Sequence, residues 1–321
     1  MEKLVKNEIV ARSICFVAAF LCLFYPTHYA HTEPSSYVKP LIVTVVQSKN
    51  SDSYLEFTKA LSDNVRDKNI DLIVIDDPAK PLPDSDLVIS VGMKAAIVIA
   101  GGKSTAILNV FLSKTGYEEL LRDFPARANS KTFSAIFLDQ PLVRQISLIS
   151  AVLPGKHRIG VLFDFLPNND LDRLRQQISK YGFSLHDRVI SQTLPLQEAL
   201  QKVLRESDML LALPNSSIYN SSTLRNILLA TYRSAIPLVG LSPSYVKAGA
   251  LCAIFSTPTQ IATQALLSIQ QFGKISTLQA AQYPQLFEVM VNEQVGQSLG
   301  LTIKNLVELH KEISASLENA L

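Results

Sequence analysis

From Pro40 onward, short runs of apolar and β-branched residues alternate with longer segments in which apolar residues recur at helical spacing. Runs that are almost wholly apolar are typical of strands buried on both faces, and their alternation with helices predicts parallel sheets covered on both sides. The predicted strands are residues 41–47, 70–76, 86–92, 106–113 and 133–139 in the first half, and 158–164, 186–190, 208–214, 236–242 and 250–256 in the second. The predicted helices are residues 52–68, 169–181, 196–206, 223–233 and 259–272.

The two halves of the chain also resemble each other. Residues 86–92 (Asp-Leu-Val-Ile-Ser-Val-Gly) align with 208–214 (Asp-Met-Leu-Leu-Ala-Leu-Pro), and 106–113 (Ala-Ile-Leu-Asn-Val-Phe-Leu-Ser) align with 235–242 (Ala-Ile-Pro-Leu-Val-Gly-Leu-Ser), in the same order. Such a repeat indicates one α/β unit used twice. The predicted fold class is therefore α/β, with two doubly wound parallel-sheet lobes. Each lobe offers the carboxyl ends of its strands as the edge where ligands bind.

The first 30 residues have the layout of a secretory signal peptide. Three basic residues precede a wholly apolar core at 14–24, and Pro26 then interrupts any helix before the small residue Ala30. The core is well under the ~20 residues that a membrane-spanning helix needs, so cleavage is favoured over an uncleaved N-terminal anchor. The sequence therefore predicts a periplasmic protein from which residues 1–30 are removed.

Composition and charge argue against several function classes. The formal net charge is +2 and no run of five like charges occurs, so nothing indicates the clustered basic surface that nucleic-acid binding requires. The five histidines are scattered, and residues 101–105 (Gly-Gly-Lys-Ser-Thr) lack the first glycine of a phosphate loop and are interpreted as a turn. Catalysis, a metal, a cofactor and a nucleic-acid partner are not expected. Cys252, the one cysteine beyond residue 30, lies in an apolar run and is predicted to be a free, buried thiol.

Two motifs of the second half resemble a known family. They are residues 213–220 (Leu-Pro-Asn-Ser-Ser-Ile-Tyr-Asn) and 236–251 (Ile-Pro-Leu-Val-Gly-Leu-Ser-Pro-Ser-Tyr-Val-Lys-Ala-Gly-Ala-Leu). These residues are similar to the periplasmic substrate-binding proteins of uncharacterised ABC transporters, including those thought to take up aromatic amino acids. Weaker similarity covers nearly all of the chain from Gln47 to Leu301.

The resemblance implies a type I periplasmic-binding fold, in which the chain crosses repeatedly between two lobes and closes over a ligand by a hinge. The crossings are expected near Asp139, near Ser256 and near residues 287–292. The implied division is 38–138 plus 257–287 for the first lobe and 139–256 plus 288–321 for the second.

The sequence departs from the family pattern at three strand ends. Residues 48–51 (Ser-Lys-Asn-Ser) stand where such proteins often carry a histidine-proline pair. Met93-Lys94 follow Gly92 in place of a small residue and proline, and residues 163–165 (Phe-Asp-Phe) replace a tyrosine-asparagine-proline. The fold and the general role survive these changes, whereas the identity of the ligand stays open.

The candidate site is predicted at the junctions where strands run into helices. The first turn of a helix exposes N–H groups and the positive end of its dipole, so residues 48–53 and 216–222 are candidates to receive an anion, with plain helix capping as the alternative. Tyrosines at such a site supply aromatic walls with a polar tip. The candidate ligand-binding residues are Ser48, Lys49, Asn50, Gly92, Met93, Leu112 and Ser113 in the first lobe, and Phe165, Asn215, Ser216, Tyr219, Ser242, Ser244 and Tyr245 in the second.

The predicted function is capture of a small organic ligand, such as an amino acid or an aromatic or aliphatic carboxylate, by a monomeric protein that delivers it to an ABC permease in the inner membrane. The same two-lobed arrangement serves a periplasmic sensor that feeds a membrane histidine kinase, or a cell-envelope regulator or enzyme on the same fold. The sequence leaves these alternatives open.

Overall fold

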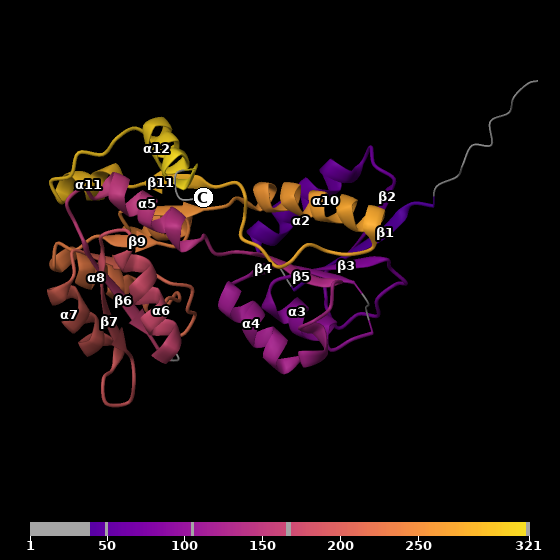
Figure 1. Cartoon of the computed structure of the whole chain (residues 1–321), viewed down its shortest axis with the longest axis horizontal. Helices are drawn as coiled ribbons and strands as arrows, with labels where there is room; N and C mark the ends of the chain where they lie inside the picture. Colours follow the sequence, from indigo (N-terminus) through magenta and orange to yellow (C-terminus); the bar gives the residue numbers. More distant parts are fainter. Residues whose placement is uncertain (1–38, 49–50, 104–105, 165–167, 319–321) are drawn as a thin grey trace, which may run out of the picture. The chain divides into compact units, whose positions relative to one another are not determined.

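Two mainly parallel β-sheets form the framework of the computed structural model, which describes residues 39–48, 51–103, 106–164 and 168–318 (Figure 1). Both sheets belong to one unit of the chain, Pro40–Leu321. The predicted signal peptide, Lys49, Asn50 and Phe165 lie outside the described residues.

The first sheet has five parallel strands in the order β2-β1-β3-β4-β5. Their bounds are β1 Leu41–Gln47, β2 Ile70–Ile75, β3 Leu87–Val91, β4 Ile107–Leu112 and β5 Phe133–Phe137. One face packs under α2 (Asp52–Val65) and α10 (Pro258–Ile275), and the other under α3 (Met93–Ala100) and α4 (Lys114–Asp123), with the short 3₁₀ helix η2 (Pro125–Arg127) after α4. Because both faces are covered, β3 and β5 are buried at every position, which explains their continuous apolar sequence.

The second sheet has six strands in the order β11-β10-β9-β8-β6-β7. Their bounds are β6 Arg158–Phe163, β7 Ser184–Val189, β8 Met209–Leu211, β9 Leu238–Gly240, β10 Cys252–Phe255 and β11 Glu288–Val291. One face packs under α5 (Leu142–Val152), α6 (Asn168–Ser179) and α12 (Leu306–Glu318), and the other under α7 (Leu196–Glu206) and α8 (Leu224–Arg233). The short helices α9 (Pro243–Ala248) and α11 (Glu293–Ser298) follow β9 and β11. Within the described ranges, none of the helices combines the length and apolar character needed to span a bilayer.

The chain passes three times between the two lobes. The first crossing, residues 138–141, joins β5 to α5; the second, residues 256–257, joins β10 to α10; and the third, residues 276–287, joins α10 to β11. The predicted fold class, two doubly wound parallel-sheet lobes joined by a hinge of several crossings, is therefore confirmed.

The predicted elements differ from the observed ones in several respects. The predicted helices do not include α4, α5, α9, α11 and α12. Eight of the ten predicted strands are one to four residues too long, because residues at one or both ends belong to the adjoining turns and not to the sheet. The helix α3 has no polar face that would create helical periodicity, since its sequence Met-Lys-Ala-Ala-Ile-Val-Ile-Ala is almost wholly apolar. The third crossing leads into β11, an unpredicted edge strand that pairs antiparallel with β10.

The internal repeat is visible in the arrangement of the strands and in one pair of aspartates. Strands β2-β1-β3-β4-β5 of the first lobe correspond in order to β7-β6-β8-β9-β10 of the second. Asp86, just before β3, accepts a hydrogen bond from the backbone N–H of Ile42 at 2.8 Å. Asp208, at the aligned position before β8, accepts from the backbone N–H groups of His157 and Arg158 at 3.0 and 2.9 Å. Each carboxylate thus ties the start of the first strand of its lobe, β1 or β6, to the start of the neighbouring strand, β3 or β8.

We expect Asp208→Ala to lower the free energy of unfolding by about 1–3 kcal/mol, since the hydrogen bonds that it removes join an ionised acceptor to N–H groups. Hydrogen bonding to the Arg158 guanidinium, at 2.8 Å, and to the two backbone N–H groups holds the pKa of Asp208 well below its usual range. A depressed pKa means that the stabilisation is present above about pH 4 and is lost as the pH falls toward the folded-state value.

Urea unfolding of Asp208→Ala, Asp86→Ala and the exposed control Asp84→Ala checks this expectation. The control should change the stability by less than about 0.5 kcal/mol. Equal losses in all three variants would contradict the assigned role of the repeated aspartates.

Candidate functional site

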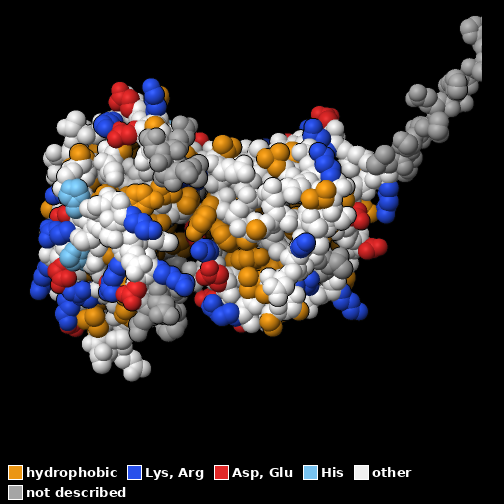
Figure 2. All heavy atoms as spheres, viewed as in Figure 1, with side chains coloured by type: hydrophobic (Ala, Val, Ile, Leu, Met, Phe, Trp, Pro, Cys, Tyr) orange, Lys and Arg blue, Asp and Glu red, His pale blue; other side chains and the backbone are white. Residues whose placement is uncertain are grey.

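A cavity of about 850 Å³ opens among segments of both lobes and of the first two crossings. This volume lies in the range that holds a small organic molecule. Its described lining is Ser51, Asp52, Ser53, Tyr54, Glu56, Phe111, Leu138, Asp139, Gln140, Gln145, Pro214, Val239, Gly240, Leu241, Ser242, Pro243, Ser244, Tyr245, Lys247, Ile254, Phe255, Ser256, Thr257 and Pro258. In the space-filling view, hydrophobic side chains gather around the middle of the visible face, with both acidic and basic groups beside them (Figure 2).

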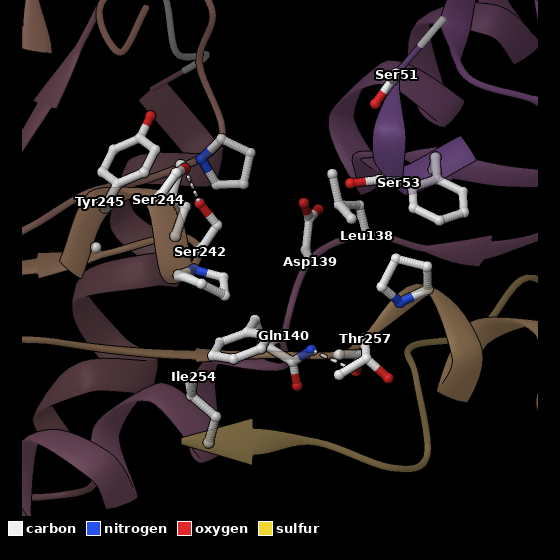
Figure 3. Close-up of a pocket in the computed structure, with 18 of the residues that line it drawn as sticks. Ser51, Ser53, Leu138, Asp139, Gln140, Ser242, Ser244, Tyr245, Ile254 and Thr257 are labelled. Atoms are coloured by element: carbon white, nitrogen blue, oxygen red, sulfur yellow. Dashed lines mark hydrogen bonds between the residues drawn. The ribbon is translucent and has the colours of Figure 1, made fainter. Parts of the chain in front are cut away.

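The start of α2 forms one wall of the cavity (Figure 3). Ser51 is the N-cap residue and has extended backbone angles, and its side chain makes no capping hydrogen bond. Since the first turn of a helix leaves N–H groups without intrahelical partners, this wall presents donors and the positive end of the helix dipole. Exposed Asp52 and Glu56 add negative charge at the same wall.

Tyr54 takes its place in this wall because of a glycine behind it. Gly92 has φ +83°, and a Cβ at that position would overlap the Tyr54 hydroxyl. Gly92 therefore acts by leaving room for Tyr54, and burial raises the pKa of the tyrosine hydroxyl.

A β-bulge turns Phe111 toward the same wall. The pairing of β4 with β5 shifts register between Val110 and Leu112, and Phe111 between them has φ 59°. Regular alternation would place Val110 and Phe111 on opposite faces of the sheet, whereas both pack on the α2 side. The Phe111 ring meets those of Tyr54 and Phe57 edge to face, with centroids 5.3 and 5.5 Å apart.

The loop after β9 and the start of α9 form the opposite wall (Figure 3). The hydroxyls of Ser242 and Ser244 share a hydrogen bond of 2.8 Å. Tyr245 donates its hydroxyl to the backbone carbonyl of Tyr219 at 3.3 Å. Tyr219 itself is buried in the core of the second lobe, and its contribution to the wall is to hold Tyr245 through that carbonyl.

Asp139, in the first crossing, lies between the two walls (Figure 3). Its Oδ2 accepts a hydrogen bond from the backbone N–H of Lys114 at 2.6 Å, at the start of α4. Its Oδ1 is buried and has no hydrogen-bond partner among the described residues. Burial raises the pKa of the Asp139 carboxyl to about 6, against the opposing effect of the Lys114 N–H group.

The neighbouring Gln140 connects the cavity to the hinge. Its amide donates to the Ser256 hydroxyl of the second crossing at 2.9 Å, and its carbonyl oxygen accepts from Arg144. Gln145, one turn into α5, donates to the Gln140 backbone carbonyl at 2.9 Å and also lines the cavity. The polar side chains of the crossings are therefore part of the site.

Three of the fourteen predicted site residues line the cavity: Ser242, Ser244 and Tyr245. Lys49, Asn50 and Phe165 lie outside the described residues. The other eight, Ser48, Gly92, Met93, Leu112, Ser113, Asn215, Ser216 and Tyr219, are not part of the described lining.

The structure gives several of these eight residues another role. The Leu112 side chain is 1% exposed and points into the core, and Ser113 caps α4 by accepting from the N–H of Gly116 at 3.0 Å. Asn215 accepts from the N–H of Ser217 in a turn. Met93 packs beside Gly116. These residues lie at or after strand ends, as predicted, but their side chains cap helices and turns or pack in the core and do not line the cavity.

The crossing residues, together with Tyr54 and Phe111, line the cavity but are absent from the predicted site. Asp139 follows β5 at the same sheet edge as the predicted loops, so the strand-end rule already pointed to it. Ser256, Thr257 and Pro258 line the cavity because the second crossing starts there.

Cys252, predicted as a buried thiol, is free and fully buried in β10, and burial raises its pKa to about 12.

Two doubly wound lobes, three crossings and a cavity between walls from both lobes define a binding protein of the type I periplasmic class. The sequence profile of the ABC transporter substrate-binding proteins matches residues 42–312. The chain belongs to this family.

Solved structures show the same fold at low sequence identity. A conserved domain protein from Vibrio cholerae is 18% identical with a TM-score of 0.57, and the match covers 84% of this chain and 98% of that one. An ABC domain from Streptococcus pneumonia in complex with L-Trp is 15% identical with a TM-score of 0.59, covering 85% and 98%. A substrate-binding protein with adhesive properties from Clostridium difficile, in a ligand-free, open structure, is 16% identical with a TM-score of 0.60, covering 83% and 96%. No curated protein matches the sequence.

We expect Gly92→Ala to weaken both folding and ligand binding, because the new Cβ displaces Tyr54 from the wall of the cavity. Positive φ costs a non-glycine residue about 1–2 kcal/mol, and the overlap with Tyr54 adds about 1–3 kcal/mol. Gly155 is the matched control, since its φ is +76° but nothing lies within 4 Å of a Cβ built on it. Urea unfolding of Gly92→Ala and Gly155→Ala measures the difference. Equal losses in the free energy of unfolding would show that Tyr54 moves aside without destabilising the protein.

Proposed function

We propose that this protein is an exported receptor that captures a small organic molecule between its lobes and delivers it to an ABC permease of the inner membrane. The observation that carries the proposal is the cavity of about 850 Å³ lined from both lobes and from the crossings. A ligand held there contacts all the parts whose relative position a hinge changes, so binding favours the closed form.

The walls favour a ligand with an anionic group and an apolar or aromatic body. The first turn of α2 supplies N–H donors and a favourable dipole for a carboxylate. Tyr54, Phe111, Tyr245 and Phe255 supply aromatic surface. The L-Trp complex of the Streptococcus pneumonia relative supports a ligand of this kind.

Binding without chemical change fits the residues of the cavity best. The described lining contains no histidine or cysteine, and the described part of the chain holds no group of three or more His, Cys, Asp or Glu side chains placed to bind a metal. Carboxylates and lysines can also act as catalytic acids, bases or nucleophiles, but among the described residues no hydrogen bond or ion pair joins any two of the lining residues Asp52, Glu56, Asp139 and Lys247. We therefore assign this protein a receptor role.

We expect a matching ligand to raise the melting temperature, because a ligand that binds only the folded state stabilises it by about 2.7 kcal/mol at 100 times its Kd. A thermal-shift screen of amino acids, aromatic acids, sugars and short peptides identifies the ligand class. Tyr245→Ala should remove most of the rise, since it deletes an aromatic wall. Tyr232→Ala is the control, because Tyr232 lies on α8 outside the cavity and is 67% exposed.

Two outcomes would contradict this proposal. A rise with neutral sugars or metal ions alone would exclude the proposed ligand chemistry. An undiminished rise in Tyr245→Ala would exclude this cavity as the site.

We expect the exported protein to lack a segment ending near Ala30, because a basic start and a short apolar core precede Pro26 and a small residue. Intact-mass measurement on protein from the periplasmic fraction tests this. A mass that retains residues 1–24 would indicate an anchored protein and overturn the predicted cleavage.

A further inference from the structure

We propose that Asp139 is the acceptor for a positively charged amine of the ligand, so that the captured molecule is an amino acid or a similar zwitterion and not a simple carboxylate. This inference rests on the proposed function, because it assigns the ligand class of the same cavity. It adds a group that the strand-end reasoning did not include.

The position of Asp139 suits this role. The side chain comes from the first crossing and lies between the α2 wall and the Ser242–Ser244 wall (Figure 3). One oxygen, Oδ2, accepts the Lys114 N–H at 2.6 Å, and the other, Oδ1, is buried without a partner among the described residues. A ligand donor beside Oδ1 would supply the missing hydrogen bond.

Capping of α4 accounts for one oxygen of the Asp139 carboxylate, Oδ2, and leaves Oδ1 without a role. An asparagine or serine satisfies a helix N-terminus about as well as an aspartate does. A buried carboxylate also loses the hydration of its charge, and for Asp139 this burial raises the pKa to about 6. The dipole of α4 and the Lys114 N–H offset part of that loss at Oδ2, but the pKa is still raised, so a ligand cation beside Oδ1 would compensate for the remainder.

The charges around Asp139 favour a cation over an anion beside Oδ1. On α4, Lys114 and Glu118 form a salt bridge of 3.8 Å and oppose each other at the Asp139 carboxyl. From the third crossing, Tyr283 faces Asp139 and is uncharged at neutral pH, its pKa being raised mainly by burial.

The charged side chains that line the cavity also favour a cation. The charged residues of the described lining are three acids and one base: Asp52, Glu56, Asp139 and Lys247. A carboxylate ligand without an amine would meet this acidic excess uncompensated, whereas a zwitterion places its carboxylate at the N–H groups of α2 and its amine at Asp139.

The first experiment compares matched ligand pairs on the full chain by calorimetry at pH 7.5. The pairs are L-phenylalanine with 3-phenylpropanoate, L-tryptophan with indole-3-propanoate, and L-leucine with 4-methylpentanoate, each differing in the amine alone. We expect at least one amino acid to bind about 10- to 100-fold more tightly than its partner, the range that a charged hydrogen bond spans.

Asp139→Asn should abolish this preference, because it keeps an acceptor for the Lys114 N–H but removes the charge. Asp139→Glu, which keeps the charge, should retain part of the preference, and the exposed Asp84→Asn, outside the cavity, should retain all of it. Melting temperatures of the ligand-free variants show whether each one folds.

The second experiment measures the pH dependence of binding, with Asp139→Asn as the control. With a pKa of about 6, Asp139 is mostly protonated at pH 5, so the affinity of the wild-type protein for the amino acid should fall about tenfold between pH 7.5 and pH 5. A folded Asp139→Asn variant lacks this titrating group and should show no such fall.

The outcomes separate this inference from the proposed function. Equal affinity for both members of every pair that binds, or an unchanged preference in Asp139→Asn, overturns the role of Asp139 and leaves the small-molecule receptor standing. A pH-independent affinity for the amino acid also overturns it. If no member of any pair binds while sugars or metal ions do, both this inference and the proposed ligand chemistry, an anionic group with an apolar or aromatic body, are wrong.

Discussion

The buried guanidinium of Arg144 is the group on which the joining of the two lobes depends. It donates to Gln140 of the first crossing and to the backbone carbonyls of Pro284 and Gln285 in the third, and it lies over the Phe287 ring at 4.7 Å. Gln140 donates to Ser256 of the second crossing, whose hydroxyl donates to the Leu286 carbonyl. Irregular backbone inside a protein needs such partners, because an unpaired buried polar group costs about 1–3 kcal/mol. One arginine and its neighbours thus let three non-helical, non-sheet segments run together.

The fold could be predicted from the sequence because each central strand is buried on both faces and therefore reads as an unbroken apolar run. The internal repeat strengthened this prediction. Asp86 and Asp208 show why, because each accepts a backbone N–H hydrogen bond at the corresponding strand start of its lobe. Two of the elements that were not predicted, β11 and α3, lack this signal. The edge strand β11 carries Glu288 and is only half-buried, and α3 is too apolar to show a helical face.

The site was less predictable, because strand ends indicate where a ligand edge lies but not which side chains reach it. The rule found Ser242, Ser244 and Tyr245, which line the cavity, but it equally selected Leu112 and Ser113, which core packing and helix capping use. Phe111 reaches the α2 wall through a bulge, and Tyr54 keeps its place through the open space at Gly92. Both effects depend on local backbone angles and on residues far away in sequence, so neither a periodicity nor a motif reveals them.

The residues of the crossing and the residues of the two walls have different roles in binding and in closure. A ligand shifts an equilibrium between open and closed forms only through contacts that differ between those forms. Asp139 and Gln140 sit in the crossing itself and reach a ligand from the hinge, whereas residues 51–54 and 242–245 approach it from opposite lobes. In the proposed receptor, the crossing therefore selects the ligand and the two walls drive closure. A small amine that satisfied Asp139 alone would bind without bringing the walls together, so only a molecule long enough to touch both would be presented to the permease.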